Sequence, residues 1–542
     1  HSYDGSHGWN TEWPRTRDIG EADLLGTMHG TFWRWPKTLS LRKSAGIAPR
    51  SNYLKVIGDF CRWKDRIVFG CDDSAKAEFL NTRVFKSKHG APGQSNSNLW
   101  FVEPAQLDRL GPVIGRGSVW MRDQVKAGVA SDPYLFAGYE RRMLHLAHAT
   151  DAEVTFTLEV DRQGDNVWER LRTIVVPAKG YAFHIFAPEE KGAWVRLKTD
   201  QDAVQVAAVF QYANADRRPV DNDAIFKGVS PAGAARSLGG LVRSLGGNKR
   251  VLGFVGIDLA TGQEQGYYEL DGMLKWSRKD DAAGRAAVLA AVPPAMVYRV
   301  DAASVIVVED NQRFRIPKDP AYAKAEARID KPSETPAAEA PATEGLCVAR
   351  VCREVATERD LFNCHGTFYE LPARNASGFF KIRPIATHRL AIHDYASYRG
   401  LMLLTGLEPA ALTAKSGHIV VSDDGRCALW AGAIDDLWRL GKPRGEGGPW
   451  KDTAVQAGVP SDPYLMTGYD KKTLALSHTD AGTVNVTVEV DPDGTGLWCA
   501  YGTFAVEAGK PVVHEFPEGF NAYWVRVKAD RSCTATAQLK YE

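Results

Sequence analysis

The chain of 542 residues carries almost no net charge, because 67 Lys and Arg residues are balanced by 66 Asp and Glu residues. A net charge of +1 produces no overall field that would attract nucleic acid or an anionic membrane surface. Long apolar runs are also missing. The longest, residues 286–297, is interrupted by Pro293 and Pro294 and is too short to span a bilayer. We therefore expect neither nucleic acid binding nor membrane insertion.

Cysteine is sparse, with eight residues in the whole chain. This number is too small for a disulfide scaffold but allows a few bridges. Cys347, Cys352 and Cys364 lack the paired spacing of a zinc site, so we interpret them as structural or bridging residues. The motifs of serine hydrolases, nucleotide-binding loops and zinc proteases are missing too, which disfavours those three classes.

What the sequence does contain is a copy of itself. Residues 128–139 return as residues 458–469, at an offset of 330 residues. The same offset relates His148 to His478, Glu159 to Glu489, Trp168 to Trp498, His184 to His514 and Arg196 to Arg526. Upstream, His29-Gly-Thr-Phe returns as His365-Gly-Thr-Phe at an offset of 336 residues. Offsets of this length indicate a repeated module of several strands.

The duplication divides the chain into a first repeat (residues 1–215), an insert (216–343) and a second repeat (344–542). Both repeats consist of short runs rich in Val, Tyr, Phe, Trp and Thr, separated by Gly, Pro or Asp, a pattern typical of strands. The insert opens with a stretch at 236–247 that we interpret as flexible or briefly helical. After further strands it ends in a Pro/Ala/Glu-rich tract, residues 319–345, which we expect to be an exposed linker.

The sequence therefore predicts an all-β fold, for which two architectures are open. In a β-propeller of about seven blades, each repeat would supply about three blades and the insert would complete the ring. The alternative combines propeller-like sheets with β-sandwich modules at residues 143–212 and 473–541. We favour the propeller, because a ring removes exposed strand edges and suits a duplicated chain.

Two repeated motifs have both a functional and a structural interpretation. His29 and His365 could act as acid and base or share a metal if they face a central channel. Alternatively, both histidines bond the backbone to hold an inner strand. The repeated Ser-Asp-Pro that begins at Ser131 and at Ser461 is interpreted as the start of a strand, because a single active site would not need both copies.

The turn that contains Asp491 and Asp493 has the oxygen-rich composition of a small calcium loop. The matching turn, residues 161–166, has lost one of these carboxylates, and no bidentate Glu follows at a suitable distance. We interpret both segments as hairpin turns. We expect no cofactor, with calcium near Asp491 and Asp493 as the alternative.

Residues that only the first repeat keeps are the main candidates for a functional site. Aromatic faces beside carboxylate and guanidinium groups are what a sugar site uses, since sugar rings stack on Trp and charged groups hold the hydroxyls. The candidate catalytic residues are His7, Glu12, Asp72 and Asp73, together with His29, the one repeated residue that is retained as a candidate. The candidate substrate-binding residues are Trp9, Trp13, Arg15, Trp33, Trp35, His89, Gln94 and Asn96.

The duplicated His-Gly-Thr-Phe and Ser-Asp-Pro-Tyr-Leu blocks, with Trp-Asn-Thr-Glu-Trp-Pro near the start, resemble uncharacterised secreted carbohydrate-active β-propeller proteins of the glycoside hydrolase and polysaccharide lyase type. The resemblance covers both repeats but not the insert. It implies a carbohydrate substrate and no particular mechanism. Because no Met precedes His1, we expect a processed secreted product or a trimmed chain, and a secreted or periplasmic location.

These observations predict an extracytoplasmic enzyme that cleaves glycosidic bonds of a polysaccharide or oligosaccharide. In a hydrolase, Glu12 and either Asp72 or Asp73 would supply the two carboxylates. In a uronate lyase, His7 or His29 would remove the proton α to a carboxylate that Arg15 neutralises. The alternative is a non-catalytic glycan-binding or structural propeller, for which the duplicated modules and the abundant Trp suffice.

Overall fold

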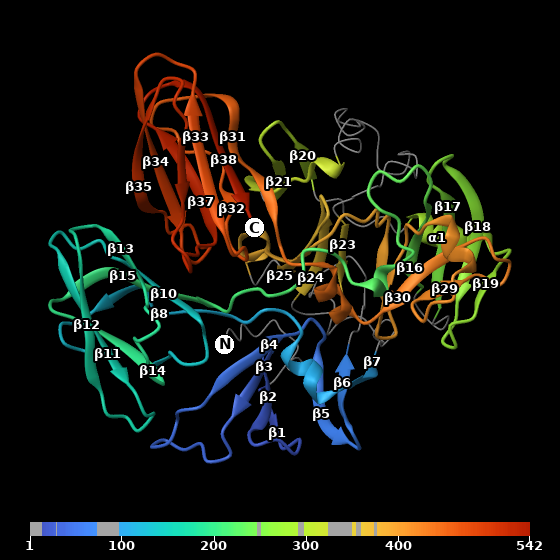
Figure 1. The fold of residues 1–542 in the computed structure, drawn as a ribbon, viewed down its shortest axis with the longest axis horizontal. Coiled ribbons are helices and arrows are strands. Elements are labelled where there is room, and N and C mark those ends of the chain that lie inside the picture. The colour runs from blue at the N-terminus through green and yellow to red at the C-terminus, as the bar shows by residue number, and fades with distance from the viewer. Residues whose placement is uncertain are drawn as a thin grey trace.

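The computed structural model describes residues 14–28, 30–72, 97–245, 251–290, 297–309, 311–322, 350–353, 359–372 and 377–542. Apart from one helix, α1 (Ala282–Ala290), and short 3-10 turns, the regular structure of these residues is β-strand (Figure 1). The predicted all-β class is therefore confirmed. None of the helices described is long and apolar enough to cross a membrane.

The first repeat begins with two small antiparallel sheets. The first holds β1 (Arg15–Arg17), β2 (Leu24–Met28), β3 (Thr31–Trp35) and β4 (Ala48–Asn52), and the second holds β5 (Ile57–Trp63), β6 (Arg66–Asp72) and β7 (Ser97–Val102). Lys64 lies in the tight turn between β5 and β6 and has a φ of 55°, as such hairpin turns require. Phe32 of the first sheet packs against Phe69 of the second, so the two sheets share one core.

Residues 114–213 form a β-sandwich, called the first sandwich below. One sheet has the order β13-β10-β15-β8 and the other β12-β11-β14-β9. The strands are β8 (Ile114–Val125), β9 (Tyr134–Leu135), β10 (Arg141–Ala147), β11 (Val154–Asp161), β12 (Glu169–Val176), β13 (Tyr181–Ile185), β14 (Trp194–Thr199) and β15 (Ala203–Ala213). Side chains alternate between the two faces of a strand, so Leu158 of β11 and Val195 and Leu197 of β14 point inward and are buried, while their neighbours face outward.

Residues 445–541 form the second sandwich, with the same strand order. Its strands are β31 (Gly445–Val455), β32 (Tyr464–Leu465), β33 (Lys472–His478), β34 (Thr483–Asp491), β35 (Cys499–Glu507), β36 (Val512–Glu515), β37 (Trp524–Ala529) and β38 (Cys533–Tyr541). The sandwich modules of the alternative architecture are thus present in both repeats, with wider bounds than predicted. A closed propeller is not found among the described residues, because in each repeat the strands after the second small sheet pair into two facing sheets.

The remaining strands form further small sheets. The insert supplies one sheet of β16 (Leu238–Ser244), β17 (Leu252–Asp258), β18 (Gln263–Leu270) and β19 (Trp276–Arg278), and a hairpin unit of β20 (Val297–Val300), β21 (Val305–Glu309) and β22 (Gln312–Ile316). The second repeat supplies β23 (Arg350–Arg353), β24 (Arg359–Cys364), β25 (Thr367–Pro372) and β26 (Arg383–Thr387) in one sheet, and β27 (Tyr395–Tyr398), β28 (Leu401–Leu404), β29 (Ile419–Val421) and β30 (Ala428–Gly432) in another. Most of the predicted linker, residues 319–345, lies outside the described residues.

The insert differs from the prediction at residues 236–247, where β16 replaces the expected flexible or helical stretch. A Cβ atom added to Gly240 would lie 2.2 Å from the ring of Phe254, and one added to Gly239 would lie 2.6 Å from Leu259. These glycines therefore make room for neighbouring side chains and allow the strand to pack closely. The prediction was wrong because it took the glycines as a sign of flexibility.

Each sandwich rests on the four-stranded sheet of its own repeat through an equivalent contact. The indole nitrogen of Trp194 donates a hydrogen bond of 2.8 Å to the Ser44 hydroxyl, in the loop between β3 and β4. The indole nitrogen of Trp524 donates one of 2.9 Å to the carbonyl oxygen of Phe380, in the loop between β25 and β26. The repeated Trp is therefore an anchor between the sandwich and the small sheet.

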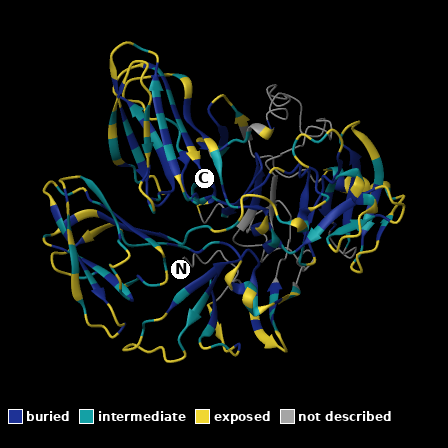
Figure 2. Ribbon diagram, in the orientation of Figure 1, coloured by how far each residue is buried: buried dark blue, intermediate teal, exposed yellow. Residues whose placement is uncertain are grey.

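The two sandwiches also contact each other (left side of Figure 1). Nε2 of His145 lies 2.8 Å from the carbonyl oxygen of Asn521, and its Nδ1 lies 2.7 Å from the Tyr181 hydroxyl. The ring of Phe183 stacks on Tyr501 with 5.7 Å between the centroids. Burial lowers the pKa of His145 to about 4, so the imidazole is neutral and uses both nitrogens as a structural link. Exposed residues lie mainly in turns at the periphery of the molecule, on the sandwiches and on the small sheets alike (Figure 2).

Candidate functional site

Most of the residues predicted to form a sugar site lie outside the described residues. These are His7, Trp9, Glu12, Trp13, His29, Asp73, His89, Gln94 and Asn96. Asp72 is the last residue of β6, Arg15 is the first of β1, and Trp33 and Trp35 belong to β3.

The structure brings Trp33 and Trp35 together but places Arg15 elsewhere. A Cβ added to Gly26 of β2 would lie 2.3 Å from the indole of Trp35 and 3.3 Å from Cβ of Trp33, so the two Trp residues lie over this glycine. Arg15 pairs with Thr27, which pairs with Phe32. Cross-strand partners share a face of the sheet, so Arg15 and the two Trp residues belong to opposite faces.

The structure describes one histidine of the repeated His-Gly-Thr-Phe and both copies of Ser-Asp-Pro. Burial lowers the pKa of His365 to about 4, so this imidazole is neutral. The hydroxyl of Ser131 accepts a bond of 3.1 Å from the Leu197 amide and donates to the Asp132 carbonyl. Ser461 makes the same two bonds in the second repeat. This bonding agrees with the interpretation of Ser-Asp-Pro as the start of a strand.

The two turns considered for calcium are closed by their own backbone. The Asp491 carboxylate accepts bonds from the amides of Gly494 (3.0 Å) and Gly496 (2.8 Å). Asp161 accepts bonds from Gly164 and Asn166, both 2.8 Å. Donors aimed at a carboxylate occupy the lone pairs that calcium would need. The described residues contain no cluster of three His, Cys, Asp or Glu side chains that could hold a metal, and the hairpin interpretation accounts for both turns.

A different set of side chains recurs in both sandwiches and faces outward, so the core does not require it. The first patch consists of Glu159 on β11, Trp168 before β12, and Arg196 and Lys198 on β14. The second patch consists of Glu489 on β34, Trp498 before β35, and Arg526 and Lys528 on β37.

In each patch the glutamate joins the two cations. Oε2 of Glu159 lies 2.7 Å from Nε of Arg196, and its Oε1 lies 2.8 Å from Nζ of Lys198. The corresponding distances from Glu489 are 2.6 Å to Arg526 and 3.2 Å to Lys528. Burial raises the pKa of Glu159, but the bonds from Lys198 and Arg196 outweigh it and hold the pKa below its usual value. Glu159 is therefore ionised at neutral pH.

In each patch the arginine also lies over the tryptophan. The guanidinium carbon is 4.3 Å from the ring centroid of Trp168 for Arg196, and 4.1 Å from that of Trp498 for Arg526. Both indoles are half-buried. The terminal nitrogens of Arg196 make no hydrogen bond to the described residues, since only Nε is used by Glu159. Each patch thus combines an aromatic ring, one face of which the arginine covers, with guanidinium nitrogens that the glutamate does not use, and such groups can bind sugars.

Hydroxyl groups extend the patches along the same faces. Thr157 of β11 lies opposite Thr173 of β12, and Thr487 of β34 lies opposite Thr503 of β35. The hydroxyls of Thr487 and Thr503 are 3.1 Å apart. In the sequence, the residues of the two patches stand at outward-facing positions between inward-facing apolar residues and recur at the same offset. Recurrence alone does not separate a binding site from a requirement of the fold, so these residues are not among the predicted site residues.

A small cavity of about 50 Å³ lies between the two sandwiches, with Arg116, Arg141 and Lys472 in its lining. The Lys472 amine donates to the carbonyl oxygens of Tyr469 (2.6 Å) and Phe520 (3.0 Å). Such a volume holds water molecules but is far below the size of a typical ligand site. We interpret the cavity as part of the joint between the sandwiches.

No family model matches this chain, and no curated protein matches it. Among solved structures, the chain is similar to the PBSX exported protein XepA, with 7% identity over 79% of this chain and 86% of that chain and a TM-score of 0.16. It is also similar to a glycoside hydrolase family 32 protein from Bifidobacterium adolescentis, with 9% identity over 75% and 98% of the two chains and a TM-score of 0.12. At these identities and TM-scores neither likeness carries an argument about function.

Proposed function

We propose that the protein is an extracytoplasmic glycan-binding protein that holds its ligand through the two patches. The observation that carries the proposal is the recurrence of one outward-facing Glu, Trp, Arg and Lys arrangement, with closely similar distances, in both sandwiches. Residues on the outer face of a sandwich are free to vary unless they bind something or stabilise the sheet. The non-catalytic interpretation of the sequence is the one that this geometry supports best.

Each patch would bind a sugar through two kinds of contact. The C–H face of the sugar ring would stack on Trp168 or Trp498, while the free guanidinium nitrogens and the lysine donate to oxygen atoms of the ligand. Each patch holds one more cation than carboxylate. This excess of positive charge favours a saccharide that carries carboxylates, such as a polymer of uronates.

Two patches on joined sandwiches would act together on a polymer. A second binding event on the same chain is intramolecular, which can raise the overall affinity about 10²–10⁴-fold over a single site. The contacts of His145 with Asn521 and of Phe183 with Tyr501 hold the sandwiches against each other. The distance between the patches would therefore be nearly constant, and short oligosaccharides would bind much more weakly than the polymer.

The test is a binding screen over neutral and uronate polysaccharides by affinity electrophoresis. We expect retardation by a uronate polymer, loss of retardation in the double variant Trp168→Ala with Trp498→Ala, and no change in Trp63→Ala, which removes an exposed Trp outside the patches. Unchanged retardation in the double variant would assign the patches to sheet stability alone.

Cleavage of glycosidic bonds stays a prediction, because its candidate residues Glu12, His7, His29 and Asp73 lie outside the described residues. The enzyme prediction is tested on the same panel by measuring the release of reducing ends and of unsaturated uronates. Turnover that Glu12→Gln abolishes would favour a hydrolase.

A further inference from the structure

The two sandwiches have the same strand order but differ at one edge. In the second sandwich, β22 of the insert pairs with the edge strand β32 and adds a further strand to the sheet. The pairing is parallel, with Arg315 opposite Tyr464. The Arg315 amide donates a bond of 2.8 Å to the carbonyl oxygen of Pro463. In the first sandwich, β9 pairs with β14 alone among the described residues and forms the open edge of its sheet there.

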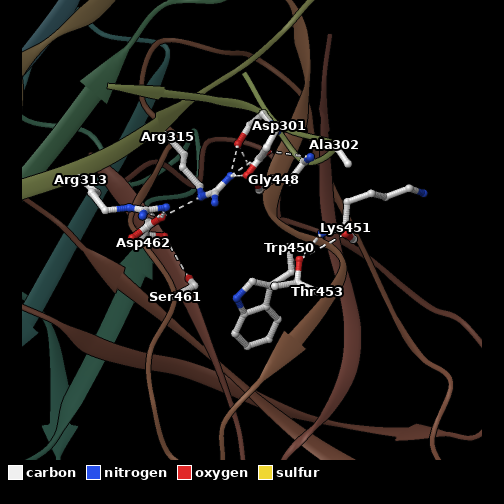
Figure 3. Close-up of polar contacts among 12 residues, drawn as sticks. Asp301, Ala302, Arg313, Arg315, Gly448, Trp450, Lys451, Thr453, Ser461 and Asp462 are labelled. Carbon is white, nitrogen blue, oxygen red and sulfur yellow. Dashed lines mark hydrogen bonds and ion pairs between the residues drawn. The ribbon is translucent and has the colours of Figure 1, made fainter. Parts of the chain in front are cut away.

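Side chains of the insert fix the added strand on the second sandwich (Figure 3). Arg315 reaches Oδ2 of Asp462 at 3.0 Å through Nε, and Arg313 reaches the same oxygen at 3.0 Å. Nη1 of Arg315 also lies 2.9 Å from Asp301. The Arg315 side chain is only 8% exposed, whereas Arg313, Asp301 and Asp462 are partly exposed, so Arg315 is the buried part of a clamp on the Asp of Ser-Asp-Pro.

The insert also covers β31, on the neighbouring edge. The Ser304 hydroxyl donates a bond of 2.8 Å to the carbonyl oxygen of Gly448. Phe314, between the two arginines, packs its ring 5.0 Å from that of Trp524. As a result, Tyr464 and Leu465 of β32 are fully buried.

The groups that bind β22 in the second sandwich have counterparts in the first sandwich, and no strand of the described part of the chain covers them there. The Ser-Asp-Pro-Tyr-Leu sequence of the second sandwich is repeated at residues 131–135. Asp132 and Pro133 are exposed, and Tyr134 and Leu135 are half-buried rather than buried. Within the described part of the chain, the Asp132 carboxylate makes no ion pair and the Pro133 carbonyl accepts no hydrogen bond.

The counterpart of the apolar surface that Phe314 covers in the second sandwich is also less buried in the first. Trp194, the counterpart of Trp524, is half-buried, whereas Trp524 is 1% exposed. Residues 117–120 of β8 are half-buried, whereas their counterparts 447–450 are buried. Pro133 does not block strand addition, because Pro463 occupies the same position in the covered edge and uses its carbonyl oxygen there.

We propose that the β9 edge of the first sandwich is a docking site for an extended segment of a partner protein, which adds as a parallel strand and places an arginine on Asp132. The covered edge of the second sandwich shows what such a segment needs. It carries two arginines separated by one apolar residue, so that both can reach the carboxylate while the apolar side chain meets Trp194. This inference is independent of the proposed glycan binding.

The test uses a fluorescent peptide with the sequence of residues 304–318 of this chain and measures its anisotropy with the full-length protein. We expect saturable binding to one site. Asp132→Asn should weaken binding about tenfold, because it removes a charged hydrogen-bond acceptor. A peptide with Gln at both arginine positions should be weakened similarly. Glu153→Gln, an exposed carboxylate elsewhere on the same sandwich, and Trp168→Ala should leave binding unchanged.

Binding that Asp132→Asn does not alter, or no binding of the peptide, would overturn the proposal. Sedimentation of the protein alone at increasing concentration tests whether a second copy of this chain occupies the edge. Self-association that Asp132→Asn abolishes would overturn the assignment to a separate partner, because a second copy of this chain would then cover the edge. A monomer at all concentrations supports the assignment.

Discussion

The guanidinium of Arg196 lies 4.3 Å above the ring of Trp168 while Glu159 holds its Nε. An exposed arginine samples many rotamers, and fixing one costs conformational entropy. Here the Glu159 carboxylate and the Trp168 indole together hold the arginine side chain in one conformation. Arg526 is held in the same way over Trp498. The geometry leaves the same atoms free in both sandwiches, which is why we assign both patches to one kind of ligand.

The planar shape of these arginines, and not only their charge, should matter for binding. Lysine keeps the charge but neither stacks on an indole nor offers a planar fork of donors. We expect Arg196→Lys combined with Arg526→Lys to weaken binding to a uronate polymer about tenfold. The free energy of unfolding should change by about 1 kcal/mol or less, because these ion pairs are partly exposed. Affinity electrophoresis and urea unfolding measure the two effects.

Arg531→Lys is the matched control, since Arg531 is exposed on the second sandwich outside the patch. It should change neither binding nor stability. Equal binding by the double variant and the wild type would show that charge alone accounts for recognition.

Gly138 should be needed for the joint between the first sandwich and its small sheet. Its φ is +86°, and an added Cβ would lie 2.7 Å from Pro49. Gly128 has a similar φ of +71° but nothing within 4 Å of an added Cβ. Gly128→Ala should therefore cost about 1–2 kcal/mol from backbone strain, and Gly138→Ala should cost more. Urea unfolding of the two variants compares them, and equal losses would contradict a close joint at Gly138.

Stability should depend on pH through Asp491. Burial, together with the neighbouring Asp493 carboxylate, raises the pKa of Asp491 to about 6, above the ordinary value of 3.8 for an aspartate. The folded state then binds more protons than the unfolded state between these two values. The contribution of this group to stability is present below pH 3.8 and is lost as the pH rises through about 6.

Asp491→Asn keeps an oxygen acceptor for the turn but cannot titrate. Its stability relative to the wild type should increase as the pH is raised from about 4 to about 7, a window set by the shifted pKa. Urea unfolding at several pH values measures this difference. A difference that does not vary with pH would contradict a raised pKa.

The sequence was sufficient for the all-β class and for most strands, because the alternation of Val195 and Leu197 with outward-facing residues is a local signal. It did not decide between blades and sandwiches, since that choice depends on which sheets face each other across a core. β16 was missed because Gly239 and Gly240 make room for Phe254 and Leu259, which lie distant in the sequence.

The candidate site was harder to predict than the fold. The sequence showed that Glu159 and Arg196 recur together, but their contact depends on β11 and β14 being neighbours in one sheet. Trp33 and Trp35 do lie together, whereas Arg15 belongs to the other face because of the register of β1. Register is set by the whole sheet and is not visible in a single strand.

The most direct test of the two-site account is the stoichiometry of binding. Isothermal titration with a short uronate oligosaccharide, too short to reach both patches, counts the sites. The account predicts two sites in the wild type, one in Trp168→Ala, one in Trp498→Ala and none in the variant that combines them. A single site in the wild type, or two sites that persist in the combined variant, would contradict it.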